Sequence, residues 1–112
     1  MIHPATPPLT LLCTLDDLPE GSSKGFGSDN VFAVNYGGKI YVYRNHCPHL
    51  GIQLEWAANQ FLDNSGSMIQ CANHGALFVI NSGQCVSGPC TGQSLHAIPH
   101  QIINDSIWIT AS

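Results

Sequence analysis

The feature that most constrains the fold is a series of short apolar runs, each ended by turn-forming residues. No segment keeps a helical periodicity over three turns. Runs of this length that are rich in Val, Ile, Tyr and Phe are typical of strands. The predicted strands cover residues 10–15, 31–36, 39–43, 67–70, 77–80, 94–100 and 106–110. The sequence therefore predicts an all-β chain.

Turn signals between these runs indicate how the strands connect. Gly37-Gly38 predicts a two-residue hairpin, a turn whose backbone needs positive φ angles. Further turns are expected at Asn64-Ser65-Gly66, Asn81-Ser82-Gly83 and Asn104-Asp105. The Gly- and Ser-rich stretch 16–30 is a connection with room for one short helical turn after Leu15. Many short strands at this spacing predict a small antiparallel sandwich or barrel.

Length and charge limit the class of protein. A chain of 112 residues is one domain with a single core, so we expect one domain over 1–112. Three basic residues against seven acidic ones argue against a nucleic-acid partner, which needs clustered Lys and Arg. No apolar stretch approaches the roughly 20 residues that span a bilayer, and the start does not resemble a signal peptide. A cytoplasmic protein without a membrane partner is expected.

Two short segments combine cysteine with histidine. Cys47-x-His49 and Cys71-x-x-His74 lie within residues 45–92, which hold four of the five cysteines and three of the six histidines. Such spacings allow both side chains of a loop to face one point. Zinc binds Cys₂His₂ sets readily, but its familiar pattern pairs cysteine with cysteine. Mixed pairs suit a [2Fe–2S] cluster in which two thiolates hold one iron and two imidazoles the other.

These segments, "CPH" and "CANH" in one-letter code, resemble the signature of the Rieske iron–sulfur family. Gly51 and Gly75, which follow the two segments, match the signature too. The "SGPC" stretch with Gly88-Pro89 resembles the loop, called the proline loop, that covers the cluster in this family. The resemblance spans residues 31–109.

The resemblance implies a fold, a cofactor and a set of ligands. The fold is a small antiparallel β-sandwich of Rieske type, with a cluster-binding subdomain over about residues 45–92 formed by two ligand loops and the proline loop. The cofactor is one [2Fe–2S] cluster. Its implied ligands are Cys47 and Cys71 on one iron and His49 and His74 on the other.

One departure from the family pattern bears on the reduction potential. High-potential members carry an extra cysteine in each ligand loop, and these two form a disulfide. The matching positions here are Ile52 and Asn73, so that disulfide is excluded. Neither residue offers a hydroxyl donor to the cluster, and fewer donors stabilise the added electron less. We expect a potential in the lower part of the range of about −150 to +300 mV that such clusters cover.

The function implied is that of a small electron carrier, a ferredoxin, rather than an enzyme, and no catalytic residue is assigned. It would take electrons from a flavin-containing reductase and pass them to an oxygenase or another oxidoreductase. Two alternatives stay open: a small subunit of a nitrite-reductase-like enzyme, and a redox-sensing protein.

The remaining cysteines and histidines are expected to be structural. Cys85 and Cys90 could form a disulfide, but a reducing compartment favours free thiols. Cys13 in its apolar run is expected to be a small buried hydrophobe. His46 is expected to be a partly exposed loop residue, and His96 a surface or sheet-face residue.

Overall fold

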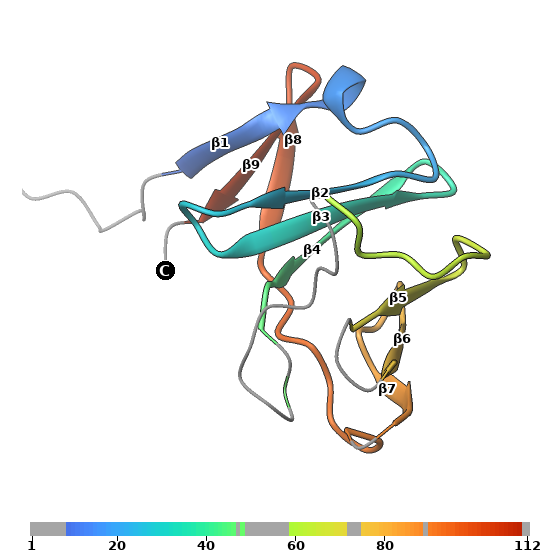
Figure 1. Ribbon diagram of the computed structural model, residues 1–112. Coiled ribbons are helices and arrows are strands. Elements are labelled where there is room, and N and C mark those ends of the chain that lie inside the picture. Colours follow the sequence, from blue (N-terminus) through green and yellow to red (C-terminus); the bar gives the residue numbers. More distant parts are fainter. Residues whose placement is uncertain (1–8, 47, 49–58, 72–74, 89, 111–112) are drawn as a thin grey trace, which may run out of the picture.

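Nine strands and one short helical turn make up the part of the chain that the structure describes. The computed structural model describes residues 9–46, 48, 59–71, 75–88 and 90–110. The strands form three antiparallel sheets (Figure 1). The first sheet orders β1 (Leu9–Thr14), β9 (Ser106–Thr110) and β8 (His100–Ile103). The second orders β2 (Ser23–Phe26), β3 (Val31–Tyr36) and β4 (Lys39–Arg44), and the third β5 (Met68–Gln70), β6 (Leu77–Val79) and β7 (Cys85–Ser87). The predicted all-β antiparallel class is confirmed.

The β3–β4 hairpin forms at the predicted turn. Gly37 and Gly38 have φ angles of 64° and 85°. Tyr36 pairs directly with Lys39, so the turn contains two residues. Positive φ at both positions favours glycine, which explains why this pair of residues ends one strand and begins the next.

The β8–β9 hairpin uses the same kind of turn without glycine. Asn104 and Asp105 have φ angles of 51° and 61°, and Ile103 pairs with Ser106 across the turn. Asn and Asp are the non-glycine residues that tolerate this region best. The Asp105 carbonyl accepts a hydrogen bond from the Leu15 N–H at 2.8 Å. This contact fixes the 3₁₀ turn η1 (Leu15–Asp17), the helical turn expected after Leu15.

The structure differs from the sequence prediction in four segments. The strands β2 and β7 were not predicted, because these segments are short or rich in Gly and Ser and gain their strand character from the neighbouring strands. The strand β8 was not predicted either, since only its first residue, His100, falls within a predicted strand. The predicted strand 94–100 is wrong over most of its length. Only an isolated bridge, Tyr43 to Ala97, joins it to β4. Pro99 has no N–H to donate, which limits regular pairing there.

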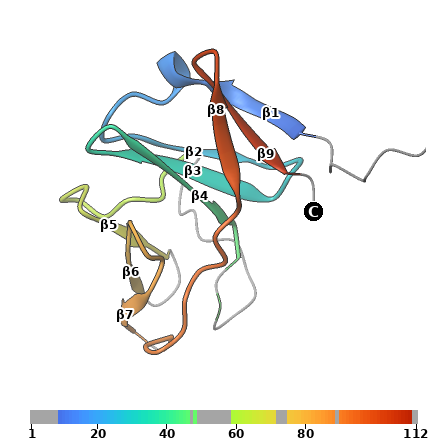
Figure 2. The same cartoon turned by 180° about the vertical axis from the view of Figure 1, so that it is seen from behind.

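The middle sheet lies between two buried cores, so the prediction of a single core is wrong. A central sheet that is apolar on both faces supports one core on each side. The aliphatic core fills the space toward the first sheet, and it consists of Cys13, Leu18, Val31, Ala33, Val42, Ile98, Ile107 and Ile109. The aromatic core fills the space toward the third sheet, and it consists of Phe32, Val34, Tyr43, Phe61, Ile69, Cys71, Ala76, Phe78, Ile80, Cys85, Cys90 and Leu95. Figures 1 and 2 accordingly show the third sheet at the opposite end of the molecule from β1.

No helix among these described segments is long and apolar enough to cross a membrane.

Candidate metal centre

The two Cys/His segments lie in loops that border the third sheet. The first follows β4 and precedes β5, and the second connects β5 to β6. Cys47, His49 and His74 lie outside the described residues, so their contacts stay a prediction. Cys71 is described, and so are the chain segments on both sides of each loop.

Cys71 lies at the base of the second loop and is fully buried, with 0% exposure. Its backbone N–H donates a hydrogen bond to the Ala76 carbonyl at 2.8 Å, which closes the loop. Gly75, directly before Ala76, has φ 61°, a conformation that reverses the chain at low cost only for glycine. The two ends of the loop are therefore held together by the backbone itself.

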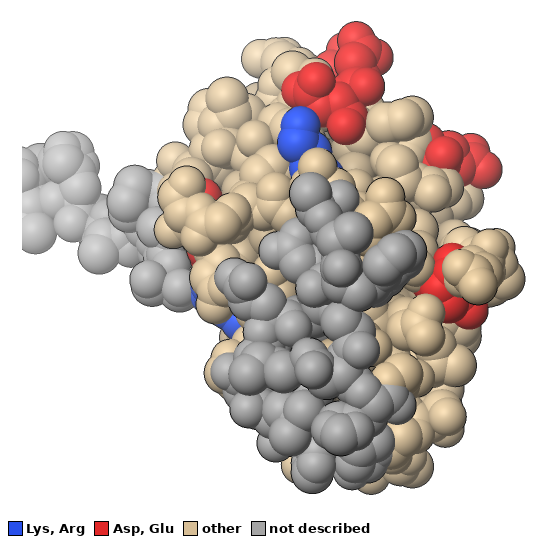
Figure 3. All heavy atoms as spheres, viewed as in Figure 1, with Lys and Arg blue, Asp and Glu red and all other residues tan. Residues whose placement is uncertain are grey.

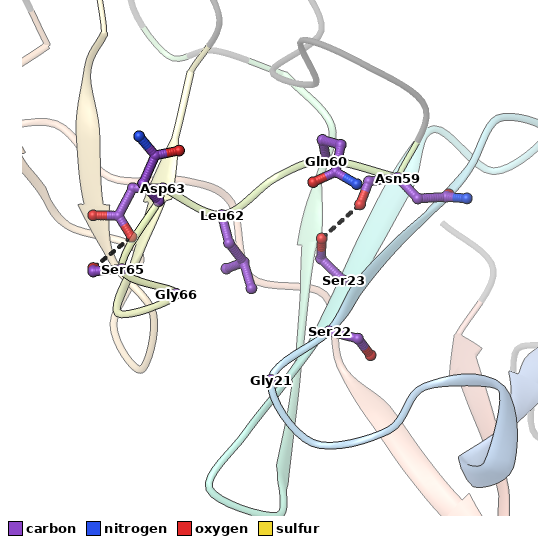
Figure 4. A pocket seen from close by; sticks show the side chains of 10 residues that line it. Gly21, Ser22, Ser23, Asn59, Gln60, Leu62, Asp63, Ser65 and Gly66 are labelled. Carbon is purple, nitrogen blue, oxygen red and sulfur yellow. Dashed lines mark hydrogen bonds between the residues drawn. The ribbon is translucent and has the colours of Figure 1, made fainter.

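The first loop is anchored at both ends to the middle sheet. Where the chain leaves β4, the N–H of buried Asn45 donates to the Asn30 carbonyl at 2.9 Å. Where it returns, the Asn59 side-chain Oδ1 accepts from the Gly25 N–H at 2.9 Å. The Asn59 carbonyl also accepts from Ser23 Oγ at 2.8 Å (Figure 4). Sequence reasoning missed these anchors, because the partners are 15 positions apart at the first end and more than 30 at the second, and such pairs leave no local signal.

The third loop contains a disulfide. Cys85, in β7, and Cys90 are bonded, with their Cα atoms 5.8 Å apart. The prediction that they are free thiols is therefore wrong. That prediction was based on the compartment, whereas the turn between them brings the Cα atoms within the separation that a disulfide needs, about 4.4–6.8 Å. Both residues are buried, with only 1% exposure.

The surroundings of Cys71 fit a thiolate that binds metal. Its neighbours in the aromatic core include Ile69, Phe78 and Ala76. A thiolate in such surroundings is unfavourable unless a metal ion compensates its charge. A bound metal deprotonates a coordinating thiol, which makes deep burial compatible with this role. Cys71 thus fits the role of an iron ligand, which the paired Cys/His spacings predict for it.

A polar hollow of about 430 Å³ is another candidate site on the described surface. It lies between the residues before β2 and the segment 59–66, as Figure 4 shows. Among the residues that the structure describes, its lining contains no cysteine or histidine, and the one titratable residue is Asp63. The Asp63 carboxylate accepts hydrogen bonds from Ser65 Oγ at 2.8 Å and from the Ser67 N–H at 3.2 Å. This carboxylate therefore serves the turn before β5 and is not free for chemistry.

The charge on the surface is sparse and mostly acidic. The chain has a net charge of −4 with only three basic residues. On the face drawn in Figure 3, acidic side chains lie along the upper and right-hand edges, and basic ones are few. Such a surface suits a partner that presents basic residues.

The remaining candidate residues are structural in the way that the sequence predicts. His46 and His96 are exposed, and the His96 carbonyl accepts a hydrogen bond from the Arg44 N–H at 2.9 Å. Cys13 is buried in the aliphatic core, and burial raises the pKa of its thiol.

Comparison with protein families identifies one match. The family model described as the Rieske [2Fe-2S] domain matches residues 9–103. This range contains all four predicted ligands and every strand of the three sheets except β9. A comparison with curated proteins finds no match.

Solved structures with the same fold include two free ferredoxins. The ferredoxin of carbazole 1,9a-dioxygenase from Nocardioides aromaticivorans IC177 has a TM-score of 0.74 and 23% identity, over 93% of this chain and 98% of that chain. The ferredoxin of Sphingomonas yanoikuyae B1 has a TM-score of 0.72 and 22% identity, over 92% and 98%. A further match, with a TM-score of 0.72 and 20% identity over 93% and 94%, comes from a complex of reduced oxygenase and oxidized ferredoxin in carbazole 1,9a-dioxygenase.

Proposed function

Because the chain belongs to the Rieske [2Fe-2S] domain family, we propose that it is a one-electron carrier that uses one such cluster. The observation that carries the proposal is the second loop. There, a fully buried Cys71 lies at the base of a backbone-closed loop that also contains His74. When bound, the cluster supplies a single reversible electron transfer.

The ligands that we propose are Cys47 and Cys71 for one iron and His49 and His74 for the other. The chain holds these loops against a rigid framework of sheets. Asn59 and Ser23 fix the return of the first loop, and Ala76 fixes the second. Fixed loop ends limit structural change when an electron arrives, and burial of Cys71 keeps water from the sulfur.

The proposed partners are a flavin-containing reductase as donor and an oxygenase as acceptor, in the cytoplasm. One structural neighbour is a ferredoxin in complex with the oxygenase of carbazole 1,9a-dioxygenase. This supports an oxygenase as the acceptor. The acidic surface favours partners with basic docking faces, since complementary charge accelerates encounter.

The proposed potential lies in the lower part of the family range. The support is chemical: Ile52 and Asn73 provide neither the loop disulfide nor hydroxyl donors to the cluster. The potential should also fall at alkaline pH, because oxidised iron promotes loss of the second imidazole proton from each histidine ligand. Protein-film voltammetry as a function of pH tests both statements. A potential near +300 mV would refute the first.

Metal analysis tests the cluster itself. Anaerobically purified protein should be red-brown and contain about two irons and two acid-labile sulfides per chain. C71S should lose the colour and the iron, because a hydroxyl is a poor replacement for a thiolate. C13S removes a cysteine from the opposite core and is the matched control, which should keep both. Stoichiometric zinc without colour in the wild-type protein would overturn the proposal.

Electron delivery needs its own test. After reduction by a flavin-containing reductase and NADH, the protein should reoxidise when an oxygenase of the carbazole-dioxygenase type is added under anaerobic conditions. The reoxidation rate should fall as salt increases, since screening weakens charge-guided encounter. A reduced protein that keeps its electron with every oxygenase tried, and gives it to a nitrite reductase, would contradict the proposed acceptor.

A further inference from the structure

A disulfide-closed turn packs against the second ligand loop. Cys85, in β7, is covalently joined to Cys90, and both belong to the aromatic core. The turn between them carries Gly88, whose φ angle is 101°. The bridge therefore holds both ends of a turn whose middle has a backbone conformation that only glycine adopts without strain.

Hydrogen bonds hold this turn in one shape. The Gly88 carbonyl accepts from Thr91 Oγ1 at 2.7 Å and from the Thr91 N–H at 3.2 Å. The Gln93 N–H donates to the Cys90 carbonyl at 2.8 Å, and the Gln93 carbonyl accepts from the Cys85 N–H at 2.8 Å. The two half-cystines are thus tied through their backbones as well as through sulfur.

Gly88 lies directly on Ala76, the residue that closes the second ligand loop. A Cβ atom at Gly88 would lie 3.0 Å from the Ala76 Cα and 3.1 Å from its Cβ. These separations are tighter than nearly all carbon contacts in proteins, so a Cβ atom at this position would have to displace Ala76 by a few tenths of an ångström. Ala76 itself is only 2% exposed. Any displacement of the turn is therefore transmitted to Ala76 by direct contact.

Ala76 in turn holds Cys71, because its carbonyl accepts the hydrogen bond from the Cys71 N–H at 2.8 Å. We infer that Cys85, Cys90 and Gly88 form a clasp that positions Cys71 through Ala76. The three residues are positioning residues, since none of them is a proposed ligand. This inference rests on the proposed function, in which Cys71 binds iron.

Two consequences follow from opening the clasp. The second loop loses the surface on which Ala76 rests, so iron should leave the protein faster. Water should also reach the loop, and water stabilises the negative charge that reduction adds, so the potential should rise. A bridge that merely stabilised the fold would change the unfolding midpoint and leave the potential of the folded protein unaltered.

The first test compares two glycines with the same backbone strain. Gly88 and Gly92 have φ angles of 101° and 95°, but a Cβ at Gly92 would meet no atom within 4 Å. In G88A the new methyl group pushes on Ala76, whereas in G92A it points into open space. Iron release to the chelator bathophenanthroline disulfonate should be about tenfold faster in G88A than in G92A, a typical effect for residues that support metal ligands.

The second test removes the bridge in two independent ways. The double variant C85A/C90A should release iron about tenfold faster than wild type, and its potential should be higher. C13A, which loses a cysteine of the aliphatic core, should match wild type in both. Dithiothreitol should accelerate iron release in wild type and have no further effect on C85A/C90A. Peptide mapping without reductant verifies the bridge in each sample.

The outcomes distinguish a failure of the proposed function from a failure of the clasp. Wild-type protein that contains no iron would overturn the proposed function and the clasp together. Iron-loaded protein in which G88A behaves as G92A, or in which C85A/C90A keeps the wild-type release rate and potential, would overturn the clasp alone. If G88A fails to fold, as judged by near-ultraviolet circular dichroism, the comparison of wild type with C85A/C90A in dithiothreitol still tests the clasp.

Discussion

The two cores on either side of the middle sheet differ in composition and in role. The aliphatic core packs small branched side chains between the first and middle sheets. The aromatic core contains Phe32 and Phe61, stacked with ring centroids 4.4 Å apart, and includes Cys71 and the disulfide. One core maintains the framework, and the other supports the ligand loops. Damage to the first should therefore reduce stability alone, whereas damage to the second should also affect the metal site.

The strand β3 explains how one short segment serves both cores. Phe32 and Val34 point into the aromatic core, and Val31 and Ala33 into the aliphatic core, all with 0% exposure. Successive side chains of a strand face opposite sides, so a central strand between two layers is apolar throughout. The separation between the two cores thus depends on the alternation of side chains along β3.

The largest expected effect comes from truncating one buried side chain in each core. F61A should lower the free energy of unfolding by about 4 kcal/mol and I107A by about 3 kcal/mol, as measured by equilibrium urea denaturation. Because Phe61 packs in the core that holds Cys71, F61A should also accelerate iron release to a chelator. I107A should leave that rate near wild type in native buffer. Equal release rates in the two variants would remove the distinction between the cores.

A smaller effect is expected from a pair of glycines with matched φ angles, Gly83 at 74° and Gly66 at 73°. A Cβ at Gly83 would lie 2.8 Å from the Tyr43 ring and 3.2 Å from the Leu95 Cβ, whereas one at Gly66 would meet nothing within 4 Å. G66A should cost about 1 kcal/mol for backbone strain. G83A should cost about 1–3 kcal/mol more, because it overpacks the aromatic core. Thermal unfolding of both variants measures the difference in stability. Similar losses of stability would show that the Tyr43 ring moves aside without cost.

Next in size is removal of the Tyr43 hydroxyl, which donates to the Ile80 carbonyl at 2.6 Å. Y43F leaves that carbonyl unpaired in the aromatic core and should cost about 1–2 kcal/mol at pH 7. Burial, with a smaller contribution from Tyr41, raises the pKa of Tyr43 from 10.0 to about 12. The folded state thus keeps a proton that the unfolded chain loses, so this stabilisation falls as pH rises from 10 to about 12.

The measurement for Tyr43 is the unfolding free energy against pH, with Y36F as the control. Tyr36 is exposed at 45%, so Y36F should follow the wild-type curve. Y43F should show a shallower decline above pH 10 than wild type. Parallel curves for Y43F and wild type in this range would mean that Tyr43 does not titrate with a raised pKa.

The smallest effect is expected at the turn before β5. Burial raises the pKa of the Asp63 carboxyl, but hydrogen bonds from Ser65 and from the N–H groups of Met68, Ser67 and Gly66 outweigh burial and lower the pKa below 3.8. A lowered folded pKa stabilises the protein above pH 3.8, and this contribution disappears as pH falls through the folded value. D63A should cost about 1 kcal/mol at pH 7.

On acidification D63A should lose less stability than wild type. Chemical denaturation from pH 7 to pH 2 measures this loss. S65A removes only the side-chain donor and should have a smaller effect. If D63A and wild type lost equal stability on acidification, the carboxylate would not support the turn.

Much of the fold was predictable where the information is local. The strands β3 and β9 begin and end where the apolar runs predict, and turns form at Gly37-Gly38 and Asn104-Asp105 as predicted, with the expected positive φ angles at the glycine pair. The strands β2 and β7 were not predictable, because their own residues have weak strand preference. Ser23–Phe26 becomes a strand by pairing with Val31–Val34. The strand predicted at 94–100 fails for a related reason, since Pro99 limits its pairing with β4.

The sequence by itself determined which chemistry to expect of this protein, because the paired Cys/His spacings predict which side chains bind an iron–sulfur cluster. Only the tertiary structure decided how that site is supported. It placed Ala76 beneath Gly88, joined Cys85 to Cys90, and tied Asn59 to β2. Spacing along a loop is a local property of the chain, whereas the contacts of Ala76 and Asn59 need separate segments to meet. The Cys85–Cys90 bridge depends on the shape of the turn between the two residues, which the spacing alone does not set.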